Sequence, residues 1–286
     1  DSAYFALAGF MLVFFWVCVG KRESLHRFMA VCVLFFAAGK IMYFLMRIDP
    51  NPELQYDFLT RLVLNSGLTW GLLVLCLALY VVLRRQKDKD YPVQTMLWVR
   101  KAVLAGTGIV IVGIILIIIL QTRELLPAGI AEKLSAVSYF RWEGEWGNGR
   151  GRIWSFVIKV FGEENLLHKL LGVGPDCLSS YVAAYHSEQA ETFWGQKVLT
   201  NAHNEWLNML INGGSLGAVS YMGIFVSAIR RFIKVAEKDI LLMGIAAATV
   251  SYMAYNFFCY QQVCCTPFVF MLLGIGEYLC RRETAK

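Results

Sequence analysis

Long apolar runs separated by short polar joints dominate the chain. Seven of these runs are long enough to cross a hydrocarbon core of about 30 Å as helices. They lie at about 2–20, 25–46, 60–83, 96–120, 204–229, 240–258 and 264–280. We therefore predict an all-α polytopic membrane helix bundle, with four spans in residues 1–120, a large helical loop at 121–203 and three spans in residues 204–286.

Polar residues recur inside the fifth run. Asn204, Asn208 and Asn212 follow an i, i+4, i+8 spacing, which places them on one face of a helix. Such a face must contact protein or a watery cavity rather than lipid. Gly213 and Gly214 come directly after it and would permit tight helix contacts, as would three glycines in the fourth run.

The loop between the fourth and fifth runs is too long for a simple connection, which indicates a functional element or a small domain. Pro127 is placed to begin a short helix through Tyr139, and Pro175 to begin one through about Tyr185. Between them, apolar residues at i, i+3, i+4, i+7 and i+8 predict an amphipathic helix over about 152–164 that packs on the spans.

Composition agrees with an integral membrane protein, because 57% of the residues are hydrophobic and 14% are aromatic. The eight cysteines fall mostly inside the runs and show no paired C-x-x-C spacing. They are typical of small buried apolar residues rather than of a zinc site or a disulfide framework.

Positive charge is concentrated in the joints after runs one, three and five and after run seven, and this explains much of the net charge of +6 without a nucleic-acid partner. These joints carry Lys21, Arg22, Arg27, Arg84, Arg85, Lys87, Lys89, Arg100, Lys101, Arg230, Arg231, Lys234, Lys238, Arg281, Arg282 and Lys286. By the positive-inside rule these joints and the C-terminus are cytoplasmic, and the loop lies on the outer side.

Two arginines, Arg150 and Arg152, lie on a glycine-rich turn in that loop. The guanidinium fork matches phosphate oxygens, and glycine lets a ligand approach the backbone, so the turn suits a phosphate ligand. The alternative is that both arginines contact lipid headgroups or solvent. His203, at the start of the fifth run, is by itself equally compatible with a helix cap or an interfacial residue.

Three blocks, followed by two glycines, resemble the O-antigen ligase and polymerase family in order and spacing. They are Gly149-Arg150-Gly151-Arg152-Ile153-Trp154, Leu171-Gly172-Val173-Gly174-Pro175-Asp176 and Ala202-His203-Asn204-Glu205, with Gly214 and Gly217 after them. The family joins lipid-linked glycans outside the cytoplasmic membrane of bacteria. The resemblance implies a glycosyltransferase that needs no metal or other cofactor, uses an undecaprenyl-diphosphate glycan as donor, and acts on a glycan or lipid acceptor.

The resemblance also implies roles for two residues. Arg150 matches the loop arginine expected to hold the diphosphate as it becomes the leaving group, where a fixed cation stabilises developing negative charge. His203 matches the histidine expected to contact the acceptor hydroxyl or to act as general base, and its ordinary pKa suits that task.

Roles for the neighbouring residues stay open. Arg152 either supplies a second phosphate contact or points to solvent, and Glu205 either orients His203 or caps a helix. Asn204 and Asn208 are candidates to line the acceptor path.

The family often carries a second arginine after a serine before the loop, but Gly67 follows Ser66 in this chain. Arg61, about a turn and a half earlier, is the candidate substitute.

Two other classes of protein remain as alternatives. A transporter or flippase of lipid-linked sugars should carry ionisable residues at mid-membrane, and inside the runs only Lys40 qualifies. A non-enzymatic scaffold of an envelope polysaccharide complex would need the bulk of the loop and the spans, but neither Arg150 nor His203.

Overall fold

The computed structural model describes residues 2–48, 58–86, 92–135, 137–195, 198–236 and 239–285. Four of the basic residues used to predict topology, Lys87, Lys89, Lys238 and Lys286, lie outside these ranges. The described residues form helices and connecting turns and no strand, which confirms the all-α prediction.

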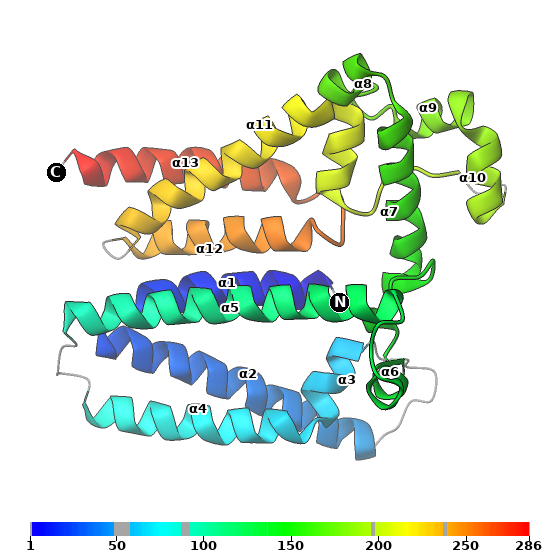
Figure 1. Cartoon of the computed structure of the whole chain (residues 1–286). Helices are drawn as coiled ribbons and strands as arrows, with labels where there is room; N and C mark the ends of the chain where they lie inside the picture. The colour runs from blue at the N-terminus through cyan, green and yellow to red at the C-terminus, as the bar shows by residue number, and fades with distance from the viewer. Residues whose placement is uncertain are drawn as a thin grey trace.

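A bundle of roughly parallel helices forms the body of the molecule (Figure 1). Its helices are α1 (Ser2–Cys18), α2 (Arg22–Ile48), α3 (Phe58–Asn65), α4 (Gly67–Arg85), α5 (Val93–Thr122), α11 (Glu205–Val235), α12 (Ile240–Tyr255) and α13 (Thr266–Thr284). Between α5 and α11 the loop forms α6 (Ala128–Ser135), η1 (Ser138–Phe140), α7 (Trp146–Glu163), α8 (Leu166–Leu171), α9 (Leu178–Tyr185) and α10 (Ser187–Trp194). These short helices gather at one end of the bundle, where α7 runs crosswise to the long helices (Figure 1).

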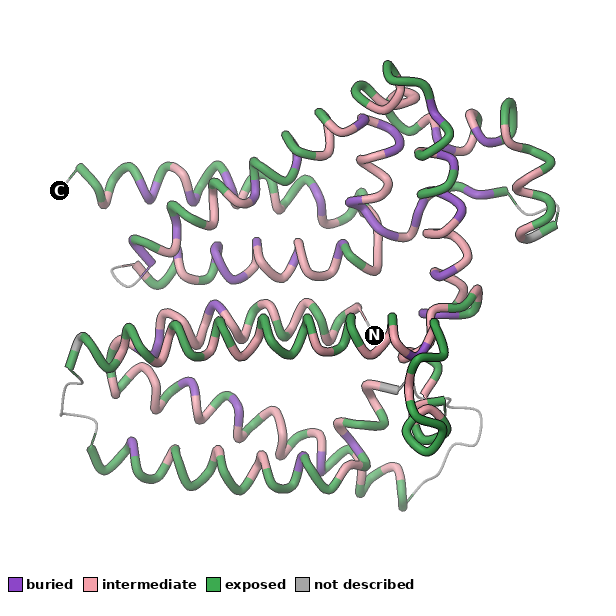
Figure 2. The backbone as a smooth tube through the Cα atoms, in the orientation of Figure 1, coloured by how far each residue is buried: buried purple, intermediate pink, exposed green. Residues whose placement is uncertain are grey.

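Four helices of the bundle, α2, α4, α5 and α11, are long and apolar enough to cross a membrane, and α1 and α12 are shorter apolar helices. Much of the surface of α4 and α5 is exposed (Figure 2), and large apolar side chains such as Ile109 and Val110 point outward. An exposed apolar surface of this extent fits contact with lipid. The chain is therefore a membrane protein, and the total of seven spans stays a prediction.

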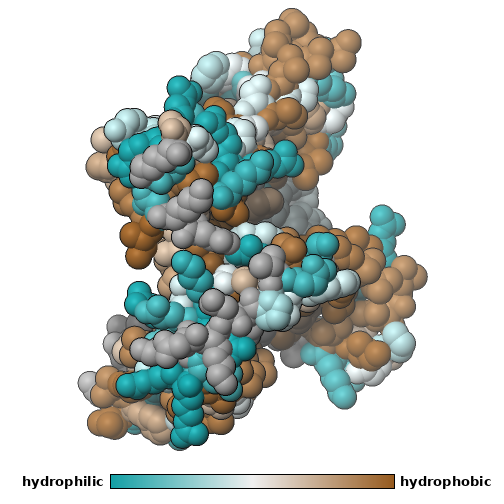
Figure 3. Space-filling view, turned by 90° about the vertical axis from the view of Figure 1, so that its left-hand side faces the viewer, coloured by the Kyte–Doolittle hydropathy of each residue, from teal (hydrophilic) through white to brown (hydrophobic). Residues whose placement is uncertain are grey.

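The ends of α1, α4, α11 and α13 and the starts of α2, α5 and α12 lie together at the end opposite the loop (Figure 1). Figure 3 views this end, where hydrophilic side chains gather. The ends of successive long helices thus alternate between the two ends of the bundle, as the pattern of basic residues predicts. Which end faces the cytoplasm stays a prediction.

The prediction of one continuous span over 60–83 is wrong, because the structure divides it at Ser66 into α3 and α4. The Ser66 hydroxyl caps α4 by accepting a hydrogen bond from the Leu68 amide at 3.0 Å. Lys40, which is buried, donates to the carbonyl oxygens of Leu64 at 2.9 Å and Ser66 at 3.0 Å. Its ammonium therefore satisfies backbone groups that the break exposes.

Close packing joins α1 to α12 and α11 to both α12 and α13. At Gly9 an added Cβ would lie 3.2 Å from the Val250 side chain, so the glycine allows α1 to approach α12 closely. By contrast, a Cβ at Gly106, Gly108 or Gly113 in α5 would meet nothing within 4 Å, so the described residues show no tight contact there. All eight cysteines are free in the described residues; Cys18, Cys32 and Cys280 are buried as predicted, but Cys264 is exposed.

A kink at Gly214 divides α11 and docks the loop onto the bundle. Gly214 has φ 67° and ψ −174°, a conformation that is essentially restricted to glycine. On the N-terminal side of the kink, the carbonyl oxygens of Ile211 and Asn212 accept hydrogen bonds from the amides of Val173 and Gly174, both at 3.0 Å. An added Cβ at Gly214 would collide with the Leu170 carbonyl. The segment around 170–174 therefore packs closely against the kink.

We expect Gly214→Ala to lower the free energy of unfolding by about 3 kcal/mol, because alanine would be strained at this φ and would clash with the loop backbone. Gly223→Ala, in the regular part of the same helix with open space around it, should change stability by less than about 1 kcal/mol. Denaturant titration of the detergent-purified protein, followed by tryptophan fluorescence, measures both. Equal effects of the two substitutions would contradict the fitted kink.

The amphipathic helix predicted over 152–164 is present in α7, with Phe156, Val157 and Val160 buried. These side chains pack on Leu178 of α9 and Ile211 of α11 among others, so the helix contacts the loop as well as the bundle.

Three other expectations for the loop need correction. The first helix is shorter than predicted and ends at Ser135, and α9 begins at Leu178 rather than directly after Pro175. The helices α8 and α10 were not predicted.

A buried carboxylate at the end of α7 ties the loop helices together. The Glu164 carboxylate accepts hydrogen bonds from Tyr181 and the Nδ1 of His168, both at 2.8 Å, and lies 3.5 Å from the Nε2 of His186. Burial alone would raise the pKa of Glu164, but the hydrogen bonds from His168, Tyr181 and His186 outweigh it and lower that pKa. Burial and the neighbouring Glu164 raise the pKa of Tyr181 to about 12.

Because the pKa of Glu164 is lower in the folded protein, its stabilising effect is fully present above the unfolded value of about 4.3 and is lost as pH falls through the folded value. We expect Glu164→Gln to cost about 2 kcal/mol at pH 7 and to reduce the loss of stability between pH 5 and pH 3. Denaturant titrations across this range measure both effects. Glu163→Gln, at the exposed neighbouring carboxylate, should behave like the unchanged protein; an equal loss there would refute the assignment.

Candidate functional site

Arg150 is held at the first turn of the regular part of α7. The preceding residues Gly147, Asn148 and Gly149 have φ values of 60°, 62° and 85°, a left-handed path that glycine and asparagine tolerate best. This path brings the Gly147 carbonyl oxygen to within 2.6 Å of the Nη1 of Arg150. The Nε of Arg150 donates to the Phe258 carbonyl oxygen at 3.1 Å, so the guanidinium is fixed between the loop and the segment after α12.

The charge of Arg150 is not paired with an acid. Its two hydrogen-bond partners are carbonyl oxygens, and no carboxylate among the described residues lies within salt-bridge distance of it. Arg141, by contrast, pairs with Glu124 and Glu143. Arg150 therefore presents an uncompensated positive charge.

Arg152 points to a different side of α7. Its guanidinium donates to the Phe193 carbonyl oxygen at 3.1 Å and forms an ion pair with Glu145. Residues two apart on a helix do not face each other. The structure therefore does not bring Arg152 into contact with the groups that hold Arg150.

His203 occupies a strained turn directly before α11. Its φ is 48°, which is uncommon for a residue with a side chain, and its amide donates to the Asn201 side chain at 3.0 Å. The imidazole is half-buried and meets the ring of Tyr260 edge-on, with centroids 5.4 Å apart.

Burial lowers the pKa of His203, and the positive charge of Arg150 lowers it further. The two side chains are therefore near enough in the fold for their charges to interact, although about fifty residues separate them in sequence. At neutral pH the imidazole is consequently kept in its neutral form, which can accept a proton.

The side chains of the two residues that follow His203 accept hydrogen bonds from backbone amides. The Asn204 side chain caps α11 by accepting a hydrogen bond from the Leu207 amide at 3.1 Å. Glu205 is almost fully buried, and its carboxylate accepts from the Gln261 amide at 2.9 Å. Because the Glu205 amide also donates to the Asn256 carbonyl oxygen at 2.8 Å, this residue joins the start of α11 to the segment after α12.

A cavity of about 660 Å³ lies between the start of α11 and the segment after α12. His203 does not line it, but Asn201 and Tyr260, which contact His203, do. Its walls include Asn201, Asn208, Asn212, Tyr260, Gln261 and Gln262, so side-chain amides provide much of its polar surface. Asn208 and Asn212 thus face a cavity, as the spacing of the asparagines predicted. The Oδ1 atom of Asn208 is buried without a hydrogen-bond partner among the described residues, while that of Asn212 accepts from the Leu178 amide at 2.9 Å.

A family model for the O-antigen ligase matches residues 57–222, more than half of the 286-residue chain. The chain belongs to the O-antigen ligase family. A comparison with curated proteins found no match. Membership in this family implies glycosyltransferase-type chemistry on lipid-linked glycans at a membrane.

Arg61 was the candidate for a second arginine of the O-antigen ligase family. It lies exposed on α3, which packs against α2 and α4. Arg150 and His203 each contact the segment after α12, Arg150 through the Phe258 carbonyl oxygen and His203 through the Tyr260 ring. A role for Arg61 beside Arg150 stays a prediction.

The segment after α12 was not predicted as part of the site. Phe258 holds Arg150, Tyr260 contacts His203, and Gln261 bonds Glu205. The signal available in the sequence was the pair Gln261 and Gln262, which is polar and uncharged between two apolar runs. A short joint that lacks basic residues and is predicted on the same side of the membrane as the loop is a candidate to pack against the loop.

We expect Arg150→Ala to raise the pKa of His203, because the substitution removes a nearby positive charge. NMR titration of ¹⁵N-histidine-labelled protein measures this, with His203→Ala identifying the signal among the four histidines. Arg152→Ala is the matched control and should leave the titration unchanged, since that guanidinium is paired elsewhere. An unaltered pKa in Arg150→Ala would show that the charges of the two side chains do not interact.

Proposed function

We propose that this member of the O-antigen ligase family is a glycosyltransferase that polymerises or ligates undecaprenyl-diphosphate-linked oligosaccharides on the outer side of the bacterial cytoplasmic membrane. The observation that carries the proposal is that Arg150, which pairs with no carboxylate among the described residues, and His203 both contact the segment after α12. The charge of Arg150 also lowers the pKa of His203. A cation next to a base matches the two demands of the reaction, a leaving diphosphate and an acceptor hydroxyl.

Arg150 binds the donor diphosphate in this proposal. A guanidinium carries five N–H donors; two are used by the carbonyl oxygens of Gly147 and Phe258, which leaves three for phosphate oxygens. As the bond between the sugar and the diphosphate breaks, the electron pair moves to the leaving oxygen. The fixed guanidinium stabilises that charge without reorganising, and no step requires a metal or other cofactor.

His203 accepts the proton of the acceptor hydroxyl while the new glycosidic bond forms. The lowered pKa of His203 keeps the ring neutral and available. The acceptor, a glycan or a lipid-linked glycan, lies in the amide-lined cavity, where Asn208 and its neighbours bind hydroxyl groups. Asn204 and Glu205 hold the turn that carries His203, and Glu205 also lines the cavity.

A single displacement of this kind inverts the configuration at the anomeric carbon. NMR analysis of the product linkage tests this step. A product that keeps the donor's configuration would exclude direct attack and require a covalent intermediate.

The structure gives no support to a flippase. Lys40, the ionisable residue that favoured this alternative, is buried against the carbonyl oxygens of Leu64 and Ser66 at the break between α3 and α4. Its hydrogen bonds stabilise the break, so a transport function is not needed to explain a lysine at this depth.

The decisive test is a polymerisation assay in membranes supplied with lipid-diphosphate repeat units. We expect Arg150→Ala to reduce chain extension by about 10²–10³-fold and His203→Ala by about 10²–10⁴-fold. The length ladder of the glycan on a gel reports both. Lys159→Ala, an exposed cation on α7, and His26→Ala, at the opposite end of the bundle, are the matched controls.

Matched expression of all variants is required. If Arg150→Ala and His203→Ala extend chains as the unchanged protein does, the glycosyltransferase assignment fails and the scaffold alternative takes its place.

A further inference from the structure

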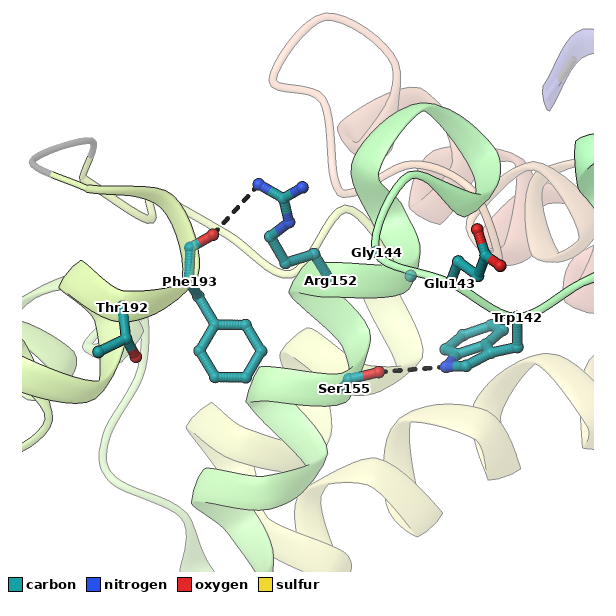
Figure 4. Close-up of a pocket in the computed structure, with 8 residues that line it drawn as sticks. Trp142, Glu143, Gly144, Arg152, Ser155, Thr192 and Phe193 are labelled. Atoms are coloured by element: carbon teal, nitrogen blue, oxygen red, sulfur yellow. Dashed lines mark hydrogen bonds between the residues drawn. The ribbon is translucent and has the colours of Figure 1, made fainter. Parts of the chain in front are cut away.

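A second cavity, of about 610 Å³, lies on the side of α7 to which Arg152 points. Figure 4 shows Arg152 and Ser155 on α7, with the Phe193 ring of α10 on one side and the Trp142 indole on the other. Glu143 and Thr192 complete its rim. The functions assigned to Arg150 and His203 make no use of this cavity.

The Trp142 ring is held in place without a ligand. Its indole nitrogen donates to the Ser155 hydroxyl at 3.2 Å, and its ring packs on Trp146 at 4.8 Å and on Trp154 at 5.9 Å between centroids. A preorganised aromatic ring at a cavity wall binds the apolar face of a ligand with little loss of side-chain entropy.

The charges around the cavity are paired. Arg152 pairs with Glu145, and Glu143 pairs with Arg141 at 2.6 Å. Among the described residues, the site therefore has no unpaired cation to attract phosphate, unlike the site of Arg150. It does offer carboxylate, guanidinium and hydroxyl groups beside aromatic rings, a combination that suits a ligand with both hydroxyl groups and C–H faces.

We propose that this cavity is a saccharide subsite, which binds an uncharged sugar residue at a distance from the reacting bond. The source of that sugar rests on the proposed function: it is either the glycan of the donor or the growing acceptor chain. In both cases Trp142 stacks on the sugar ring, while Arg152, Ser155 and Glu143 bind its hydroxyl groups.

Saturation-transfer NMR on the purified full chain tests binding apart from catalysis. The probes are the neutral oligosaccharide released from repeat-unit lipid by mild acid, N-acetylglucosamine, and glucuronate as the charged comparison. We expect signals from the two neutral probes and a markedly weaker one from glucuronate. Trp142→Ala should reduce the neutral signals about fivefold, which is the loss of one stacking contact.

Because Trp142 also packs on two other tryptophans, its substitution can disturb folding. Thr192→Trp fills the cavity from an exposed position on α10 and should reduce the signals equally. Glu188→Trp, exposed on the same helix and outside the cavity, is the matched control and should leave them unchanged. Signals that persist in Thr192→Trp, or that are absent from the unchanged protein, overturn the subsite.

Two further measurements separate this proposal from the catalytic one. The neutral-probe signals should persist in Arg150→Ala; their loss would place the sugar at the catalytic site and overturn a separate subsite. In the polymerisation assay, Thr192→Trp should raise the KM for the donor if the donor's glycan occupies the cavity, or shorten the ladder if the growing chain does. A normal KM together with a normal ladder would also overturn the proposal.

Discussion

The hydrogen bonds between the loop segment at 173–174 and the kinked start of α11 are the constraint on which the site depends. The carbonyl oxygens of Ile211 and Asn212 are available to the loop because α11 kinks at Gly214. Since the loop is joined there to a membrane helix, α7 is held across the end of the bundle (Figure 1). Arg150 at one end of α7 can therefore reach the segment after α12. Without this joint, the loop would be tethered to the bundle mainly through side chains.

Both candidate catalytic residues follow backbone turns of unusual conformation. Arg150 comes after three residues with positive φ, and His203 itself has positive φ. Such conformations cost energy and persist only where the surroundings enforce them. At Arg150 the enforcing contacts are the carbonyl oxygens of Gly147 and Phe258, and at His203 they are the Asn201 side chain and the capped start of α11. The backbone of the site is thus shaped before any substrate arrives.

Patterns of short range predicted much of this molecule. Apolar runs located the long helices, and the i, i+3, i+4 spacing located the buried face of α7. The asparagine spacing predicted a side of α11 that contacts protein or a cavity, and Asn208 and Asn212 line a cavity. The break at Ser66 had a local signal, the serine cap before Gly67, which the apolar run masked. The contribution of Lys40 could not be predicted, because that residue is distant in sequence. Arg150 and Arg152 point in different directions because Arg150 donates to the Phe258 carbonyl oxygen and Arg152 to that of Phe193. Such tertiary contacts leave no periodic signal in the sequence.

The charge balance at this end of the bundle distinguishes one arginine from its neighbours. Arg141 and Arg152 are each paired with glutamates, which neutralise them locally and limit their attraction for anions. Arg150 is oriented by neutral carbonyl oxygens, so its position is fixed while its charge stays available. The same charge lowers the pKa of His203 and keeps that ring neutral. Under the proposed function, a diphosphate that neutralised Arg150 would reduce this repulsion and raise the pKa of His203, so donor binding would prepare the ring to accept the acceptor's proton.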